Sequence, residues 1–276
     1  MAFPPNPGAN PDAELPDTLH FLPQEADFAL LGQPTNCYLI FTERGTLVVD
    51  PPSQRAEALD EIEGAARGPI AAILLTHTHP DHIGGVAALA ARSGAMVYGH
   101  PAAPTSLPDE LPFHSLEEGD EFEGWLIHET PGHRLDSLTF YQPATGIAIV
   151  GDVVAGAGTV IIDPPDGDLF DYLRTLHRLR DEIRPALLCP GHGPLIDQPE
   201  TLLTHFIQHR LGREQLVLAA LSQNPASLAD LLPRVYADTP PALYPLAERS
   251  LLAHLLKLER EGRARQEGIR WEGAVG

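Results

Sequence analysis

The chain has 276 residues, 43% of them hydrophobic and 20% charged, and its 38 acidic and 18 basic side chains give a formal net charge of −20. This composition is typical of a globular protein with a substantial core, and so acidic a chain is a poor non-specific binder of nucleic-acid backbones. Two cysteines exclude a disulfide framework, and because residues 1–20 lack the apolar segment of a signal peptide and no apolar run reaches the roughly 18 residues of a membrane span, we expect a cytoplasmic protein with no membrane partner.

The hydrophobicity pattern predicts an α/β arrangement in the first two thirds of the chain. Short apolar runs between turn residues indicate strands, and apolar residues three or four positions apart indicate helices. A continuous apolar run at 71–75 suits a strand that is buried on both faces. In chain order we expect strands at 28–31, 36–41 and 46–50, a helix at 53–67, a strand at 71–75, a helix at 83–92, strands at 96–99, 125–129, 138–141 and 147–150, a helix at 168–184 and a strand at 186–189.

The pattern changes after residue 198. Helices are predicted at 201–221, 227–236 and 243–261, followed by a hairpin at 263–272, which is the order of a winged helix. Residues 201–276 carry 9 basic and 8 acidic side chains, so that nearly all of the negative charge lies in residues 1–200. We therefore expect a flexible lead-in at 1–16, a main domain at 17–200 and a mostly helical C-terminal domain at 201–276.

The strongest chemical signal is the segment His77-Thr78-His79-Pro80-Asp81-His82, which follows the expected buried strand at 71–75. Alternate residues of an extended segment point the same way, so that His77 and His79 can converge on one point. Asp81 and His82 begin the next helix, near its positive end. Imidazole suits zinc, and an added carboxylate suits a second, harder metal site. Taken alone, this segment is also compatible with a histidine-rich loop that binds nothing.

Three later segments each place a histidine or an aspartate beside glycine at the end of an apolar strand. This is the arrangement of a site that loops build at one edge of a sheet. The segments are Thr130-Pro131-Gly132-His133, Val150-Gly151-Asp152 and Pro190-Gly191-His192-Gly193.

With these segments in this order, the chain resembles the metallo-β-lactamase superfamily over about residues 28–200. The resemblance implies an α/β fold, a four-layer αββα sandwich with two divalent metal ions at one edge, for which we expect Zn²⁺, with Mn or Fe as alternatives in the second site. It implies one ion on His77, His79 and His133, a second on Asp81, His82 and His192, and Asp152 as the bridge between them. Where the family has Asp-Thr-Gly, this chain reads Asp50-Pro51-Pro52. We expect Asp50 to hydrogen-bond to a ligand side chain without binding the metal itself.

Further segments resemble one subgroup, which has a C-terminal winged-helix-like domain and includes a mitochondrial single-strand endoribonuclease and fungal polyketide thioesterases. These segments are 151–159, 171–173, His209-Arg210 with Arg213-Glu214, and 254–262. For the segment that begins at His209, we favour ion pairing between the domains over contact with the site or the substrate.

The expected activity is metal-dependent hydrolysis by a metal-bridging hydroxide, with Asp81 relaying a proton to the leaving group. The acidic surface favours a small acyl substrate (a thioester, a lactone or an ester) over a long polyanion. One alternative is a single-strand-specific endoribonuclease acting on RNA, and a second is a non-enzymatic winged-helix binding protein. Duplex DNA is not an expected partner, because the candidate recognition helix carries Glu248, Glu259 and Glu261. The oligomeric state is left open by the sequence.

Overall fold

The structure, a computed structural model, describes residues 4–28, 33–222 and 224–274. It divides into two compact units, the first comprising Met1–Thr130, Asp136–Thr159 and Ile183–Leu202, the second Pro131–Leu135, Val160–Glu182 and Leu203–Gly276. The strand expected at 28–31 falls mostly on residues outside the described part of the chain.

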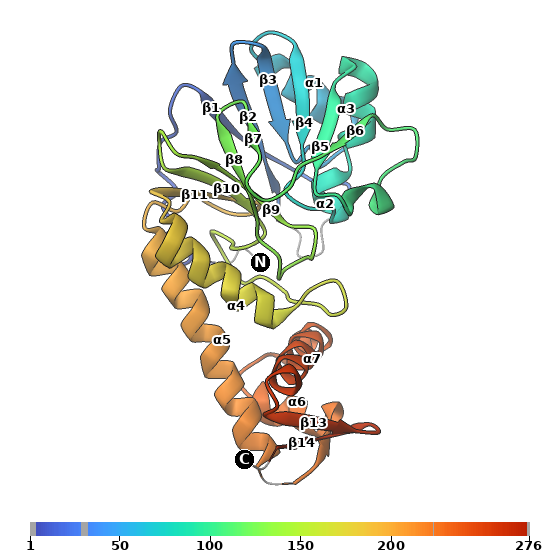
Figure 1. Ribbon diagram of the computed structural model, residues 1–276, viewed down its shortest axis with the longest axis vertical. Helices are drawn as coiled ribbons and strands as arrows, with labels where there is room; N and C mark the ends of the chain where they lie inside the picture. Colours follow the sequence, from blue (N-terminus) through green and yellow to red (C-terminus); the bar gives the residue numbers. More distant parts are fainter. Residues whose placement is uncertain (1–3, 29–32, 223, 275–276) are drawn as a thin grey trace. The chain divides into compact units, whose positions relative to one another are not determined.

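Two β-sheets form the first unit (Figure 1). The six-stranded sheet has the order β1-β2-β3-β4-β5-β6, and the five-stranded sheet has the order β11-β10-β9-β8-β7. The first sheet consists of β1 (Leu19–Gln24), β2 (Thr35–Thr42), β3 (Gly45–Val49), β4 (Ile70–Leu74), β5 (Met96–Gly99) and β6 (Phe113–Ser115). The second consists of β7 (Glu121–Phe122), β8 (Trp125–Glu129), β9 (Leu138–Gln142), β10 (Ile147–Gly151) and β11 (Leu187–Pro190).

The central strands β2, β3 and β4 of the six-stranded sheet are largely buried on both faces, as the continuous apolar run at 71–75 predicts for β4. Along β2, Tyr38 and Ile40 join the core between the two sheets, whereas Cys37 and Leu39 join a second core. That second core also contains Leu59 of α1 (Ala56–Ala65) and Leu89 of α3 (Val86–Ser93), so these helices cover the outer face. The alternation follows from the two-residue period of a strand. A short helix, α2 (Pro80–Ile83), precedes α3, and a 3₁₀ turn lies at Ala103–Ser106.

Parallel strand pairs bring the loops that carry the candidate ligands to strand ends of the same sense. Strand β3 runs parallel to β4, and β10 runs parallel to β11. Asp50 follows β3, the His77–His82 segment follows β4, Asp152 follows β10 and His192 follows β11. In open α/β sheets, ligands bind outside the carboxyl ends of the strands. The fold therefore places these loops where a ligand site is expected.

The described residues of the second unit form four α-helices and a small sheet. Its helices are α4 (Leu169–Arg178), most of α5 (Pro199–Leu221), α6 (Leu228–Val235) and α7 (Tyr244–Arg260), with a π-helical turn at Leu179–Ile183 after α4 and a 3₁₀ turn at Pro241–Leu243. Strands β12 (Ala226–Ser227), β14 (Arg270–Gly273) and β13 (Ala264–Glu267) pair in that order. Helix α6 begins with a reciprocal capping box between Ser227 and Asp230, as their spacing predicts.

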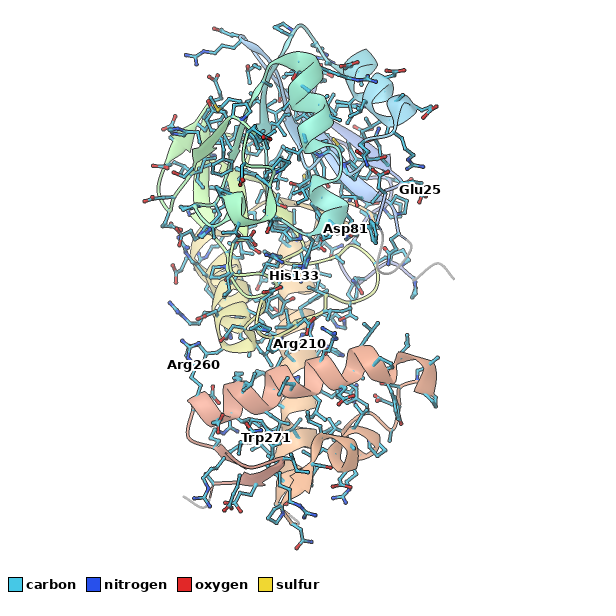
Figure 2. The ribbon with its side chains drawn as sticks, turned by 90° about the vertical axis from the view of Figure 1, so that its right-hand side faces the viewer. Glu25, Asp81, His133, Arg210, Arg260 and Trp271 are labelled. Atoms are coloured by element: carbon cyan, nitrogen blue, oxygen red, sulfur yellow. The ribbon has the colours of Figure 1, made fainter. Side chains whose placement is uncertain are left out.

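Trp271 of strand β14, labelled in Figure 2, lies at the centre of the winged-helix core and is 1% exposed. It packs in one cluster with Val217 of α5, Leu231 of α6 and Leu255 of α7. Three helices that share a core with a hairpin form a winged helix, and the structure thus confirms the architecture that the element order predicts.

Residues 4–16 hydrogen-bond to loops of the first unit. The Asn6 side chain donates to the carbonyl oxygens of Ala155 and Gly158 at 2.8 and 2.9 Å, and the Asn10 amide donates to Leu195 at 2.7 Å. The domain limits and the flexibility of this lead-in stay predictions. Among the described helices, none combines the length and the hydropathy that crossing a membrane requires.

Candidate metal centre

Asp50 organises the start of the histidine segment from the end of β3. Its Oδ1 accepts the Thr76 backbone N–H at 2.8 Å, and its Oδ2 accepts the Thr76 hydroxyl at 2.5 Å and the Nδ1–H of His82 at 2.9 Å. Asp50 has a left-handed backbone, with φ of 52°. Since Nδ1 of His82 donates to Asp50, the neutral imidazole that would bind a metal ion has its lone pair on the other ring nitrogen, Nε2. Asp50 therefore makes the supporting contact that its place in the sequence predicts.

His77 and His79 converge as their alternation predicts. Nε2 of His77 lies 3.2 Å from Nδ1 of His79. Together with Asp152, these two histidines offer ligand atoms that all lie within 4.8 Å of one another. His77 is also within the same mutual distance of Asp50 and His82. Two imidazoles and a carboxylate at this spacing can share one cation.

A second group comprises Asp81, His82 and His192, whose ligand atoms also lie within 4.8 Å of one another. Nε2 of His192 lies 3.5 Å from Oδ2 of Asp81 and 3.4 Å from Oδ2 of Asp152. The other oxygen of Asp152, Oδ1, lies 3.5 Å from Nε2 of His82. Asp152 thus belongs to the group of His77 and His79 and also lies beside His82 and His192, so that its carboxylate can contact a cation in either group.

The electrostatics of this edge favour positive charge. Burial lowers the pKa of an imidazole, but the Asp152 carboxylate outweighs it and raises the pKa of His82 to about 10 and that of His192 to about 11. Burial raises the pKa of Asp152, but the charges of His192 and His82 hold it well below its ordinary value. The pKa of Asp81 is also lowered, because the hydrogen bond from His192 and the charge of His82 outweigh its burial. The site therefore holds two carboxylates that stay ionised and favour positive charge beside them.

The loop that carries His192 is held by two side chains of strand β2 that sequence reasoning missed. The Asn36 amide donates to the carbonyl oxygens of Pro190 and Gly193, both at 2.8 Å. The Tyr38 hydroxyl donates to Pro190 at 2.8 Å. Nδ1 of His192 donates to the carbonyl oxygen of Pro34 at 2.9 Å, which leaves Nε2 toward the carboxylates. A buried asparagine in an otherwise apolar strand was the available signal.

Gly191 leaves room for the ligands. A Cβ atom at this position would lie 2.3 Å from Oδ1 of Asp152 and 2.7 Å from Cε1 of His82. Atoms cannot approach that closely, so any larger residue would displace a candidate ligand. The glycine before His192 is thus required by the close packing of the site.

His133 lies in the segment Pro131–Leu135, which belongs to the second unit. Its side chain is buried, and its Nδ1 donates to the carbonyl oxygen of Ile161 at 2.8 Å, within the same unit. The first unit thus brings together six of the seven predicted ligands, His77, His79, Asp81, His82, Asp152 and His192. The role of His133 beside them stays a prediction.

The donor set at this edge fits divalent metal ions. Imidazole nitrogens and carboxylate oxygens are the ligands that zinc prefers outside thiolate sites. Nε2 of His82 is buried and, among the described residues, accepts or donates no hydrogen bond. An imidazole that is held by its Nδ1–H and has a buried, unused Nε2 beside a carboxylate is arranged as a metal ligand.

Comparison with known proteins identifies the class. The model of the metallo-beta-lactamase superfamily matches residues 30–192, and that of the beta-lactamase associated winged helix domain matches residues 227–271. A Beta-lactamase-like protein 2 homolog of Drosophila melanogaster is 32% identical over 257 residues, which cover 86% of this chain and 86% of that protein. An atrochrysone carboxyl ACP thioesterase of Aspergillus fumigatus is 26% identical, and the match covers 87% of this chain and 80% of that protein.

Among solved structures, a beta-lactamase domain protein from Burkholderia ambifaria superposes with a TM-score of 0.82 at 22% identity, covering 95% of this chain and 93% of that one. The chain belongs to the metallo-β-lactamase superfamily and is a hydrolase of that fold, with a C-terminal winged-helix domain. Both the predicted fold class and the predicted family resemblance are confirmed. Members of this superfamily bind divalent metal ions, in agreement with the clusters of histidine and aspartate described above.

Proposed function

We propose that the protein is a dizinc hydrolase that cleaves small acyl substrates, namely thioesters, lactones or related esters. The observation that carries the proposal is the convergence of Asp81, His82, Asp152 and His192, whose carboxylate oxygens and Nε2 atoms lie 3.4–3.5 Å apart at one edge of the first unit. These separations are longer than strong ion pairs, and they suit donor atoms that share a cation better than donor atoms that satisfy one another.

The ligand assignment follows the two groups. His77 and His79 would hold one ion together with His133, as the family resemblance implies. Asp81, His82 and His192 would hold the second ion. Asp152 would contact both, because it is grouped with His77 and His79 and also lies 3.4–3.5 Å from Nε2 of His82 and His192. Zinc is the proposed metal because five of these seven side chains are imidazoles.

The chemistry is hydrolysis of an acyl bond. Two divalent ions held by these residues would supply Lewis-acid polarisation of the carbonyl group and a hydroxide nucleophile near neutral pH. The oxygen of water bonds to the acyl carbon, and the bond from that carbon to the leaving sulfur or oxygen breaks. Asp81 is ionised, so its Oδ2 can accept the proton of the water and deliver it to the leaving group.

Charge argues for a small substrate. The net charge of −20 opposes the approach of a long polyanion such as single-stranded RNA, and it would make any such binding weak and steeply salt-dependent. The similarity to a thioesterase from Aspergillus fumigatus supports acyl substrates in particular. A thioester or lactone needs no phosphate contacts, so the acidic surface does not oppose it.

The test is a substrate panel for the zinc-loaded protein, with thioesters, lactones and simple esters beside a labelled single-stranded RNA. Asp81→Ala should reduce acyl turnover by about a hundredfold or more, the usual range for a lost proton-transfer group. Asp60→Ala is the matched control, since Asp60 is an exposed aspartate of helix α1 and should leave turnover unchanged.

Acyl turnover that depends on Asp81 supports the proposal. Internal cleavage of the RNA that is lost in Asp81→Ala, with no acyl turnover, would replace it by an endoribonuclease activity. No turnover of any substrate by fully zinc-loaded protein would overturn the proposed class of substrate.

A further inference from the structure

We propose that Arg210 of helix α5 is a positioning residue for His133, which it holds with Nε2 available to a metal ion. The inference rests on the proposed function, in which His133 is a ligand. It concerns only the second unit, where both residues lie. Sequence analysis favoured ion pairing between domains for the segment that begins at His209, and the contacts of Arg210 suggest a more specific role.

A hydrogen bond within the second unit orients the His133 ring. Its Nδ1 lies 2.8 Å from the carbonyl oxygen of Ile161, and the ring is buried. A carbonyl oxygen only accepts hydrogen bonds, so Nδ1 carries the proton and Nε2 of the neutral ring carries the lone pair. His82 and His192 are held by their Nδ1 atoms in the same way. His133 is thus prepared as a ligand only while the carbonyl group of Ile161 stays in place.

The loop at 160–168, which supplies that carbonyl group, forms a closed frame with the segment at 131–135. The backbone N–H of Leu135 donates to the carbonyl oxygen of Asp166 at 3.0 Å, and the backbone N–H of Asp168 donates to the carbonyl oxygen of Gly132 at 2.9 Å. The Thr175 hydroxyl of α4 donates to Pro131 at 2.7 Å. The frame therefore connects the segment that carries His133 with the loop through backbone hydrogen bonds, and with helix α4 through the Thr175 hydroxyl.

Gly132 sets how closely this frame approaches helix α4. Its φ is +138°, and a Cβ atom there would lie 2.2 Å from Cα of Tyr172. Only glycine allows this approach. His133 follows directly, so the position of its backbone is fixed by the contact with Tyr172.

Arg210 holds the other end of the frame. Its guanidinium group donates to the carbonyl oxygen of Val160, the residue before Ile161, and lies 5.5 Å from the centre of the Tyr172 ring. The residue is only 4% exposed. Burying a guanidinium group is costly unless its contacts compensate, and a carbonyl acceptor with an aromatic face is such a compensation. In Figure 2, Arg210 lies between His133 and helix α7 along the vertical axis.

Two arginines of helix α7 also reach this region, but from exposed positions. Arg249 pairs with Asp163, and Arg260 pairs with Asp168 at 3.2 Å, with side chains that are 59% and 48% exposed. Exposed ion pairs contribute little to stability. Arg210, in contrast, is buried, and it donates to the peptide next to the one that accepts from His133.

Arg213 offers a matched control on the same helix. It also donates to a backbone carbonyl oxygen, that of Val235, and its guanidinium lies 4.4 Å from the centre of the Tyr236 ring. Its carboxylate partner is Asp238, at 2.9 Å. None of these partners belongs to the 160–168 loop, so Arg213→Met removes similar contacts without touching the frame.

The experiment compares Arg210→Met, Arg210→Lys, Arg213→Met and His133→Ala in the full chain. Zinc affinity is measured by competition with a chromogenic chelator, and the absorption bands of the Co²⁺-loaded proteins report the ligand set without reference to activity. Arg210→Met should weaken the site that contains His133 by about tenfold, at the lower end of the range for groups that orient a ligand, and should alter its Co²⁺ spectrum. Arg210→Lys, which retains one donor, should lie between Arg210→Met and the wild type, and Arg213→Met should match the wild type.

Unchanged zinc affinity and Co²⁺ spectrum in Arg210→Met would overturn the inference, as would equal losses in Arg210→Met and Arg213→Met. If Arg210→Met does not fold, the comparison of Arg210→Lys with Arg213→Lys decides in the same way. His133→Ala separates the two proposals. If it leaves zinc binding intact, the ligand assignment of the proposed function fails, whereas a loss confined to His133→Ala contradicts the role of Arg210 alone.

Discussion

Two regions of the molecule gather charged side chains around buried ones, and they arrange these charges differently. In the second unit, the Glu214 cluster consists of the buried Glu214 and Lys257 with the exposed Glu261 and Arg263, and Lys257 lies 2.6 Å from Glu214 and 2.8 Å from Glu261. At the metal centre, the corresponding carboxylate–imidazole separations are 3.4–3.5 Å. In the Glu214 cluster, the opposite charges are paired with one another at short distances. At the metal centre, the donor atoms lie farther apart, and a cation would bring them together.

The difference teaches how to distinguish a structural charge cluster from a ligand site. Buried charges in short, paired contacts need nothing further, and their removal is felt as lost stability. At the metal centre, Nδ1 of His82 is held by Asp50 and Nδ1 of His192 by a backbone carbonyl group. The Nε2 atoms are thereby oriented to bind a metal ion. Variants in the first region should therefore affect stability, and variants in the second should affect metal binding and turnover.

Asp152→Ala tests the metal side of this comparison with the largest expected effect. It removes the carboxylate that is grouped with His77 and His79 and also lies 3.4–3.5 Å from Nε2 of His82 and His192. We expect loss of at least one metal equivalent and a decrease in turnover of about a thousandfold, because the stabilisation by a metal ion is worth several kcal/mol. Elemental analysis of the purified variant gives the metal content, and full occupancy would contradict the assignment.

Lys257→Met tests the structural side. It leaves Glu214 buried with Arg263 as its one remaining ion-pair partner in the described part of the chain. We expect the free energy of unfolding to fall by about 3 kcal/mol, the lower end of the range for a broken buried pair. Urea unfolding measures this change. The double variant Lys257→Met with Glu214→Leu should recover much of the loss, and zinc content should stay at the wild-type value in both proteins.

Asp50→Asn sharpens the comparison, because Asp50 orients a ligand without being assigned as one. The change removes the carboxylate that accepts the Nδ1–H of His82 and the Thr76 hydroxyl. Zinc affinity should fall by about 10–100-fold while the fold is retained. Chelator competition measures the affinity. Wild-type affinity in this variant would show that His82 needs no such support.

The pH dependence of stability tests a third kind of burial, that of His254 in helix α7. Burial and the charges of Arg210 and Lys257 hold the pKa of His254 well below 6.5. Among described residues neither ring nitrogen has a hydrogen-bond partner. Below pH 6.5 the unfolded chain therefore binds a proton that the folded chain does not, so that stability falls as the pH is lowered, by at most about 1.4 kcal/mol per unit.

The measurement is urea unfolding of chelator-treated wild type and His254→Leu at pH 7.5 and 5.5. The variant lacks the imidazole and should lose less stability on acidification than the wild type. Equal losses in the two proteins would show that His254 does not contribute to the acid sensitivity.

The sequence predicts those helices and strands whose buried side chains recur with a regular period. Strands β5 and β8 have the predicted bounds, whereas the helix expected at 83–92 is divided into α2 and α3 at Gly84 and Gly85. Strand β1 was missed because Leu19–Gln24 contains a proline and alternates poorly, and it forms through antiparallel pairing with β2. Strands β6, β7 and β12 are too short for any period to show.

The candidate ligands were predictable because each stands beside a strand end with a local motif. The side chains that hold the ligand loops in place were harder to predict. Asn36 and Tyr38 bond to carbonyl groups more than 150 positions away in the chain. Such contacts depend on which strands become neighbours and leave no local spacing in the sequence. Asp50 was found because it follows a predicted strand, and Arg210 was noticed as part of a motif without its partner.

The measurement that tests the central claim most directly is a calorimetric titration of chelator-treated wild-type protein with Zn²⁺, alongside Asp152→Ala. The account predicts two zinc equivalents per chain in the wild type and at most one in the variant. Fewer than two equivalents in the wild type, or the same two in Asp152→Ala, would contradict a dinuclear centre bridged by Asp152.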